Sequence, residues 1–151
     1  MRDGGYYNSW NFDHDLVQDY IFAVNDVGVN VVELGFRTLN QKGFKGACAY
    51  TKDEFLETLK IPKKLKVAVM VNASDLLNFG TKDPIKNTKL LFSHKRNSKV
   101  TLVRIAAHHH EINKILKVIN FLKKYGYNVA LNIMQIADRS DQEISSICKD
   151  L

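Results

Sequence analysis

The sequence predicts an α/β protein built on a parallel sheet, and two observations carry this prediction. Short apolar runs, most of them rich in valine, occur at 29–36, 65–72, 100–107 and 127–137, as in strands that are buried on both faces. Between them lie stretches whose apolar residues recur at helical spacing. Regular strand–helix alternation is typical of βαβ units with parallel strands. A barrel and a doubly wound open sheet both fit this pattern, although no Gly-x-Gly-x-x-Gly motif follows a strand.

The first two predicted helices have recognisable boundary signals. Asp13 is a suitable N-cap for an amphipathic helix, and Gly28 is suited to the position just past its end. Thr51 and Glu54 have the spacing of a capping box, which predicts a helix over 52–60.

Three further helices follow along the chain. A weaker pattern predicts one around 84–92. The stretch 111–125 has a clear apolar face, lysines near its end and Gly126 directly after it. Ser140 and Glu143 have the spacing of a second capping box, which opens the last helix.

Length and composition restrict the class of protein. A chain of 151 residues suits one domain with a sizeable core. The net charge of +6 comes from scattered lysines with no recognition-helix motif, so we expect no nucleic-acid partner. No apolar run reaches the roughly 18 residues of a membrane span, and no signal peptide is recognisable. Cys48 and Cys148 lack metal-site spacing, which favours a reducing cytoplasm. A homo-oligomer is left open.

Polar and charged side chains occur within the predicted strands or where they end. They are Asp3, Glu33, Asn72, Arg104, His108, Asn132 and Gln135, and residues 1–3 are expected to be the carboxyl end of a first strand whose body is missing. Barrels and open sheets both build their sites at the carboxyl ends of the strands. These residues are therefore the candidates for chemistry.

Three motifs carry a resemblance to a known family. The stretch "RDGGYYNSWNF" followed by a helix, the strand "VVELGFR", and "VRIAAHHHE" on a later strand resemble the metal-dependent aldolase and acyltransferase barrels with a pyruvate carboxyltransferase domain. This family includes 3-hydroxy-3-methylglutaryl-CoA lyase, isopropylmalate synthase and 4-hydroxy-2-oxovalerate aldolase, and the last branch is the most similar. The resemblance implies a partial (β/α)8 TIM barrel. Residues 1–151 would form a single incomplete domain, truncated at both ends and holding about the first five βα units.

The resemblance also implies a reaction. The full-length protein would be a carbon–carbon lyase that cleaves or forms a bond in 2-oxo or 4-hydroxy-2-oxo acids through an enolate, whereas the isolated fragment would be inactive. A divalent metal, Mg²⁺ or Mn²⁺, would spread the negative charge. The alternative is a non-catalytic barrel of the same family that binds a metabolite or a partner. Tyr6 favours this alternative slightly, because the oxovalerate aldolases carry a histidine there as base.

Four residues would carry the chemistry if the resemblance holds. Asp3 would be the hard anionic ligand of the metal. Arg2 would donate hydrogen bonds to the developing enolate oxygen. Tyr6 or His108 would move a proton.

Three further residues are expected to bind substrate, namely Glu33, Arg104 and Asn132. Each also has a simpler interpretation. Glu33 in an apolar strand requires a partner, and Arg104 could be that partner. Asn132 could cap its strand end. In the same way, Arg2 and Asp3 could form an exposed ion pair at a frayed terminus.

Overall fold

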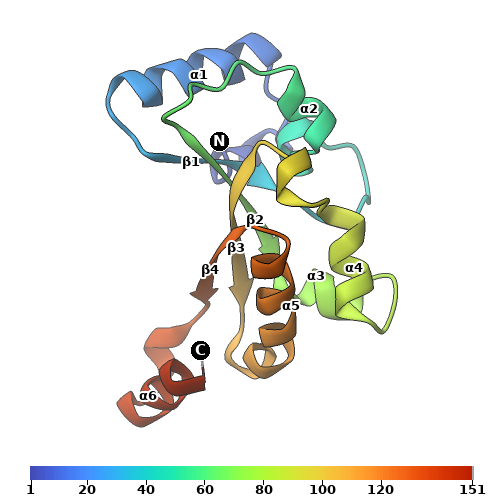
Figure 1. The fold of residues 1–151 in the computed structure, drawn as a ribbon, viewed down its shortest axis with the longest axis vertical. Coiled ribbons are helices and arrows are strands. Elements are labelled where there is room, and N and C mark those ends of the chain that lie inside the picture. Colours follow the sequence, from blue (N-terminus) through green and yellow to red (C-terminus); the bar gives the residue numbers. More distant parts are fainter. Residues whose placement is uncertain (151) are drawn as a thin grey trace.

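The computed structural model describes residues 1–150 and contains a four-stranded parallel sheet (Figure 1). The strands are β1 (Val31–Phe36), β2 (Lys66–Asn72), β3 (Val100–Ala107) and β4 (Asn128–Ile133). They lie in the order β1-β2-β3-β4, and each neighbouring pair is parallel. A doubly wound sheet reverses its strand order at a switch point, whereas a barrel adds strands sequentially. The observed order is that of part of a barrel, which confirms the predicted fold class.

Four of the six helices in residues 1–150 lie between consecutive strands, one precedes the first strand and one follows the last. The helices are α1 (His14–Asp26), α2 (Asp53–Glu57), α3 (Ala73–Asn78), α4 (Pro84–Leu91), α5 (Ile112–Lys124) and α6 (Asp141–Asp150). Figure 1 shows α3, α4 and α5 on the same side of the sheet, and α6 beyond the end of β4. Within residues 1–150, no helix is long and apolar enough to cross a bilayer.

The main core lies between the helices and the helix-facing side of the strands. Val69 and Ile105 are fully buried there, together with Val17 of α1 and Ile115 of α5. The opposite side of the sheet, called the inner face below, has a smaller apolar cluster of Phe36, Met70 and Ala106. Because side chains alternate along a strand, this second face is available to a functional site.

The element boundaries test the sequence predictions. Ser140 and Glu143 form the predicted capping box, since the Ser140 N–H donates to Glu143 Oε2 at 2.9 Å and the Glu143 N–H donates to Ser140 Oγ at 3.4 Å. The predicted box at Thr51 and Glu54 is wrong. Thr51 has a positive φ of 38°, and its hydroxyl donates to the carbonyl of Cys48, so it does not cap α2.

Three other predictions need correction. The strand predicted at 127–137 ends at Ile133, because Gln135 takes a left-handed conformation (φ 56°) that an extended strand does not accommodate. Helix α3 was not predicted, since its six residues are too few for a clear apolar period. Residues 1–3, predicted to end a first strand, form a turn in which the Met1 carbonyl accepts from the Gly5 N–H.

A bulge in β1 determines which side chains face inward. The register with β2 shifts between Glu33 and Gly35, so two residues of β1 oppose one residue of β2. Leu34 is therefore buried in the main core, while Phe36, three residues after Glu33, joins the apolar cluster of the inner face. The bulge places both Glu33 and Phe36 on the inner face.

The small residues at 45–50 allow backbone to lie directly against β1. A Cβ on Gly35 would lie 1.7 Å from the Cys48 carbonyl oxygen, and one on Gly46 would lie 2.1 Å from the Trp10 carbonyl oxygen. The Gly46 N–H also donates to the Ser9 carbonyl at 2.9 Å. The N-terminal segment is thereby held beside the end of β1. Cys48 is buried here, and burial raises the pKa of its thiol to about 11.

We predict that Gly35→Ala lowers the free energy of unfolding of the full-length protein by at least about 2 kcal/mol, because the added methyl group collides with fixed backbone. Urea unfolding measures this change. Gly4→Ala is the control: its Cβ would lie 3.9 Å from the nearest atom, on Phe12, and its effect should stay within about 0.5 kcal/mol. Equal effects of the two substitutions would contradict the close approach.

Candidate active site

Glu33 and Arg104 form a bidentate ion pair on the inner face. Arg104 Nε donates to Glu33 Oε2 at 2.7 Å, and Arg104 Nη2 donates to Glu33 Oε1 at 2.6 Å. The two residues come from β1 and β3, which flank β2, and the β2 residue opposite Glu33 is the small Ala68. The alternative interpretation from sequence, that these two residues pair with each other, is confirmed.

Arg2 adds a second guanidinium group to Glu33. Arg2 Nε lies 2.5 Å from Glu33 Oε1, and Arg2 Nη2 lies 2.6 Å from Asp3 Oδ1. The Nε–H does not point along a hydrogen bond, so its contact with Glu33 is electrostatic. The Arg2 guanidinium also lies over the Phe36 ring, 5.6 Å from its centroid. Arg2, Asp3, Glu33 and Arg104 are called the charged cluster below.

Burial distinguishes the members of the charged cluster. The side chains of Arg2 and Glu33 are only 18% and 19% exposed, whereas that of Asp3 is 77% exposed. The Arg2–Asp3 pair is therefore strongly screened by solvent, and the contacts to Glu33 are screened less. The hydrogen bonds from Arg104 to Glu33 raise the pKa of Arg104, so this guanidinium stays charged.

Aromatic rings stand beside the charged cluster. The Tyr6 and Trp10 ring centroids are 4.8 Å apart, and those of Trp10 and Phe36 are 5.5 Å apart, both edge to face. The Trp10 indole N–H donates to the Arg2 carbonyl at 2.8 Å. Tyr6 is 63% exposed, and its ring lies 6.2 Å from that of Phe36. The Tyr6 ring and the Arg2 guanidinium thus both lie next to the Phe36 ring.

The two other predicted site residues lie further along the sheet. His108 directly follows β3, and its N–H donates to Glu111 Oε2 at 2.9 Å, with the His108 and His110 rings stacked. Asn132 is exposed on β4, opposite Ala106 of the inner face. Within residues 1–150, no hydrogen bond or ion pair joins either side chain to the charged cluster.

The described residues do not form a metal site by themselves. Within residues 1–150, no three His, Cys, Asp or Glu side chains gather in an arrangement that could hold an ion. Asp3 offers one carboxylate, and its neighbour is the cation of Arg2. This arrangement is insufficient for the oxygen-rich coordination that Mg²⁺ or Mn²⁺ requires.

A cavity of about 190 Å³ adjoins the aromatic rings, and of its lining residues Tyr6 and Asn72 were candidates from the sequence, whereas Thr38, Lys45 and Asp75 were not. Its walls include Lys45, Asn72 and Asp75, and the Thr38 hydroxyl donates to Asp75 Oδ2 at 2.5 Å. Their position in the sequence could have indicated Thr38 and Asp75 as site residues, because they come shortly after the ends of β1 and β2. Lys45 gave no such signal, since the turn at 45–50 reaches the site only through close backbone contacts.

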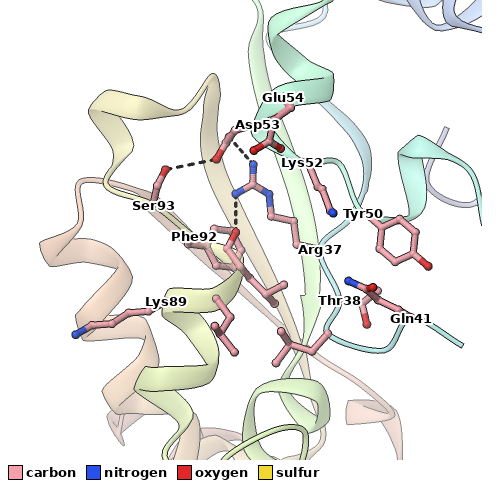
Figure 2. A pocket seen from close by; sticks show the side chains of 13 residues that line it. Arg37, Thr38, Gln41, Tyr50, Lys52, Asp53, Glu54, Lys89, Phe92 and Ser93 are labelled. Atoms are coloured by element: carbon pink, nitrogen blue, oxygen red, sulfur yellow. Dashed lines mark hydrogen bonds and ion pairs between the residues drawn. The ribbon is translucent and has the colours of Figure 1, made fainter.

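A larger cavity, of about 580 Å³, is lined in part by Arg37, whose guanidinium group binds other parts of the protein (Figure 2). Arg37 is 2% exposed and donates to the carbonyls of Thr51 and Leu91 and, at 2.6 Å, to Asp53 Oδ1. Ser98 also donates to Asp53. Since these donors bind protein groups between β1, α2 and the end of α4, the network connects elements on the helix side and is not part of the inner face.

No family model matches the chain, and no curated protein matches it. Among solved structures, it is similar to a crystal structure described as the N-terminal domain of a "putative aldolase" from Bacteroides vulgatus. The match has a TM-score of 0.79 and 28% sequence identity over 95% of this chain. The chain has an aldolase-like α/β fold. It spans 46% of the length of the Bacteroides vulgatus chain.

We predict that Glu33→Gln lowers the free energy of unfolding by about 1–3 kcal/mol, because two guanidinium groups with limited exposure lose their anionic partner. Urea unfolding of the full-length protein gives the value. Adding Arg104→Met to Glu33→Gln should recover part of the loss. Glu54→Gln, an exposed helix position, is the control and should change stability little. A Glu33→Gln protein as stable as this control would show that the charged cluster is not formed.

Proposed function

We propose that this chain is part of an aldolase-type carbon–carbon lyase that acts on 2-oxo or 4-hydroxy-2-oxo acids. The aldolase-like fold supports the general kind of activity, together with the family resemblance of the "RDGGYY" and "VVELGFR" motifs. The observation that carries the proposal is the Arg2 guanidinium, which Glu33, Asp3 and Phe36 hold in one position beside the inner face. A fixed guanidinium is suited to an oxygen on which negative charge develops.

The proposed reaction cleaves the C3–C4 bond of a 4-hydroxy-2-oxo acid. A base removes the proton of the 4-hydroxyl group, the C3–C4 bond breaks, and its electron pair moves onto the 2-oxo group as an enolate. The carbonyl of an aldehyde forms at C4, and the enolate carbon then takes up a proton. Arg2 would donate to the enolate oxygen, an interaction that contributes about 3–4 kcal/mol in comparable oxyanion sites.

The residue that moves the proton is assigned by position. Tyr6 lies beside the Phe36 ring that Arg2 covers, so it is the nearer candidate. His108 lies at the carboxyl end of β3, and its backbone N–H donates to the Glu111 carboxylate. Glu33 and Arg104 would act on the substrate through Arg2 and through the charge of the inner face, and Asn132 would contact a substrate oxygen from β4.

A divalent metal, Mg²⁺ or Mn²⁺, is part of the proposal because the resemblance implies it. Asp3 is the residue we assign as its ligand, since its carboxylate is exposed and binds only Arg2 among the described residues. Residues 1–150 do not complete the coordination, so further ligands would come from other residues and we assign no step to the ion. The unpaired cysteines are compatible with the proposed cytoplasmic location.

A non-catalytic binding barrel is the second candidate function. Both carboxylate oxygens of Glu33 are engaged by arginines, as in a structural ion-pair network. Tyr6 also stands where the resembling aldolases have a histidine base. Catalytic turnover by the full-length protein distinguishes the two functions.

We predict that the full-length protein, with Mg²⁺ or Mn²⁺, releases pyruvate from 4-hydroxy-2-oxopentanoate, and that Asp3→Asn abolishes this turnover without changing the melting temperature. The exposed carboxylate contributes little to stability, so only activity should fall. Tyr6→Phe should lower kcat by about 10²–10⁴-fold if Tyr6 moves the proton. Pyruvate is measured with lactate dehydrogenase and NADH.

Tyr7→Phe is the control for Tyr6→Phe, because Tyr7 is 95% exposed and should not affect turnover. Full activity of Asp3→Asn would exclude Asp3 as a metal ligand. Full activity of Tyr6→Phe would transfer the proton step to His108. No pyruvate release from any 4-hydroxy-2-oxo acid would favour the binding barrel.

A further inference from the structure

The cavity of about 190 Å³ lies directly beside the charged cluster. Phe36, the last residue of β1, and Asn72, the last residue of β2, both line it, so it opens at the carboxyl ends of these strands. The Arg2 guanidinium covers the same Phe36 ring that forms part of the cavity wall. A molecule held by Arg2 would therefore have this cavity as its neighbour.

Three polar side chains of the cavity have unused hydrogen-bonding capacity. Asp75 accepts from Thr38 through Oδ2, and its Oδ1 accepts no hydrogen bond within residues 1–150. Lys45 forms no ion pair with the described residues, and its ammonium lies 5.7 Å from the Trp10 ring centroid. The Asn72 amide has no side-chain partner in the same part of the chain. All three are half-buried, so these groups are partly shielded from water.

We infer that this cavity binds the hydroxylated, uncharged end of the substrate, so that the aldehyde partner of the aldol reaction is a hydroxyaldehyde. This inference rests on the proposed function. A hydroxyl group both donates and accepts, and it satisfies Asp75 Oδ1 as well as the Lys45 ammonium or the Asn72 amide. An alkyl chain would bury these groups without partners, which is costly.

The size and charge of the cavity further restrict the class of aldehyde that it can bind. The cavity has the volume of about six water molecules, which suits a chain of a few carbon atoms. The cavity holds one cation, Lys45, and one carboxylate, Asp75, so it has no excess positive charge to compensate a phosphate group. The rings of Tyr6 and Trp10 offer apolar surface for the C–H groups of such a chain. These features favour glyceraldehyde-like aldehydes over propanal or glyceraldehyde 3-phosphate.

The test is aldol addition by the full-length protein with pyruvate and Mg²⁺ or Mn²⁺. We expect kcat/KM for glyceraldehyde to exceed that for propanal and for glyceraldehyde 3-phosphate by at least about tenfold, as in sites built to bind hydroxyl groups. Equal or better use of propanal would overturn the inference while leaving the proposed function intact. Preference for the phosphorylated aldehyde would overturn it as well.

Variants link this preference to the cavity. Lys45→Met and Asp75→Asn should each reduce the ratio of kcat/KM for glyceraldehyde to that for propanal. A structural defect would instead lower both values together and preserve the ratio. Lys42→Met, at an exposed position that does not line the cavity, is the control and should leave the ratio and the activity unchanged. An unchanged ratio in both cavity variants would overturn the inference.

If no aldehyde reacts, the proposed function is refuted, and a binding experiment tests the cavity by itself. Saturation-transfer NMR then compares erythritol with butane-1,4-diol on the same protein. An erythritol signal that is stronger than the butanediol signal and is lost in Lys45→Met supports the cavity as a site for hydroxylated chains. No erythritol signal, or equal signals, overturns it.

Discussion

The arrangement of the inner face depends on the charge of Glu33. A carboxylate within a buried parallel strand is unfavourable unless cations compensate it, and here Arg104 and Arg2 supply them from β3 and from the N-terminal segment. The bidentate pair crosses β2, and the contact with Arg2 brings the N-terminal segment to the sheet. One carboxylate therefore connects three parts of the chain that are far apart in sequence.

Backbone geometry makes this arrangement possible. The bulge of β1 places Glu33 and Phe36 on the same face, although an ordinary strand would direct residues three apart to opposite faces. Gly35 leaves room on the helix side for the turn at 47–49, and that turn supports the segment containing Trp10. The result is a fixed Arg2 with a charged neighbourhood on one side and a polar cavity on the other. This combination is suited to a substrate with an anionic end and a hydroxylated end.

The fold was largely predictable from sequence, whereas the site was predictable only in part. Buried parallel strands leave continuous apolar runs such as that at 65–72, so the alternation is visible, but the end of β4 depends on the backbone of Gln135, for which composition gives no signal. The pairing of Glu33 with Arg104 was one of two interpretations, because an isolated charge in a strand demands a partner. Two features could not be predicted, namely the position of Lys45 in the cavity wall and the contact between Arg37 and Asp53. Both depend on packing between segments that are separated in sequence, and a local sequence pattern does not indicate such packing.

The most direct test of the account is a crystal structure of the full-length protein with oxalate, an analogue of the pyruvate enolate, in the presence of Mg²⁺. The account predicts oxalate beside the inner face, with an oxygen within about 3 Å of the Arg2 guanidinium, the distance of a charge-assisted hydrogen bond. Arg2 should keep its contact with Glu33 in that complex. Oxalate bound elsewhere, with Arg2 and Glu33 in unchanged contact and no ligand beside them, would show that the charged cluster is a structural network and not the active site.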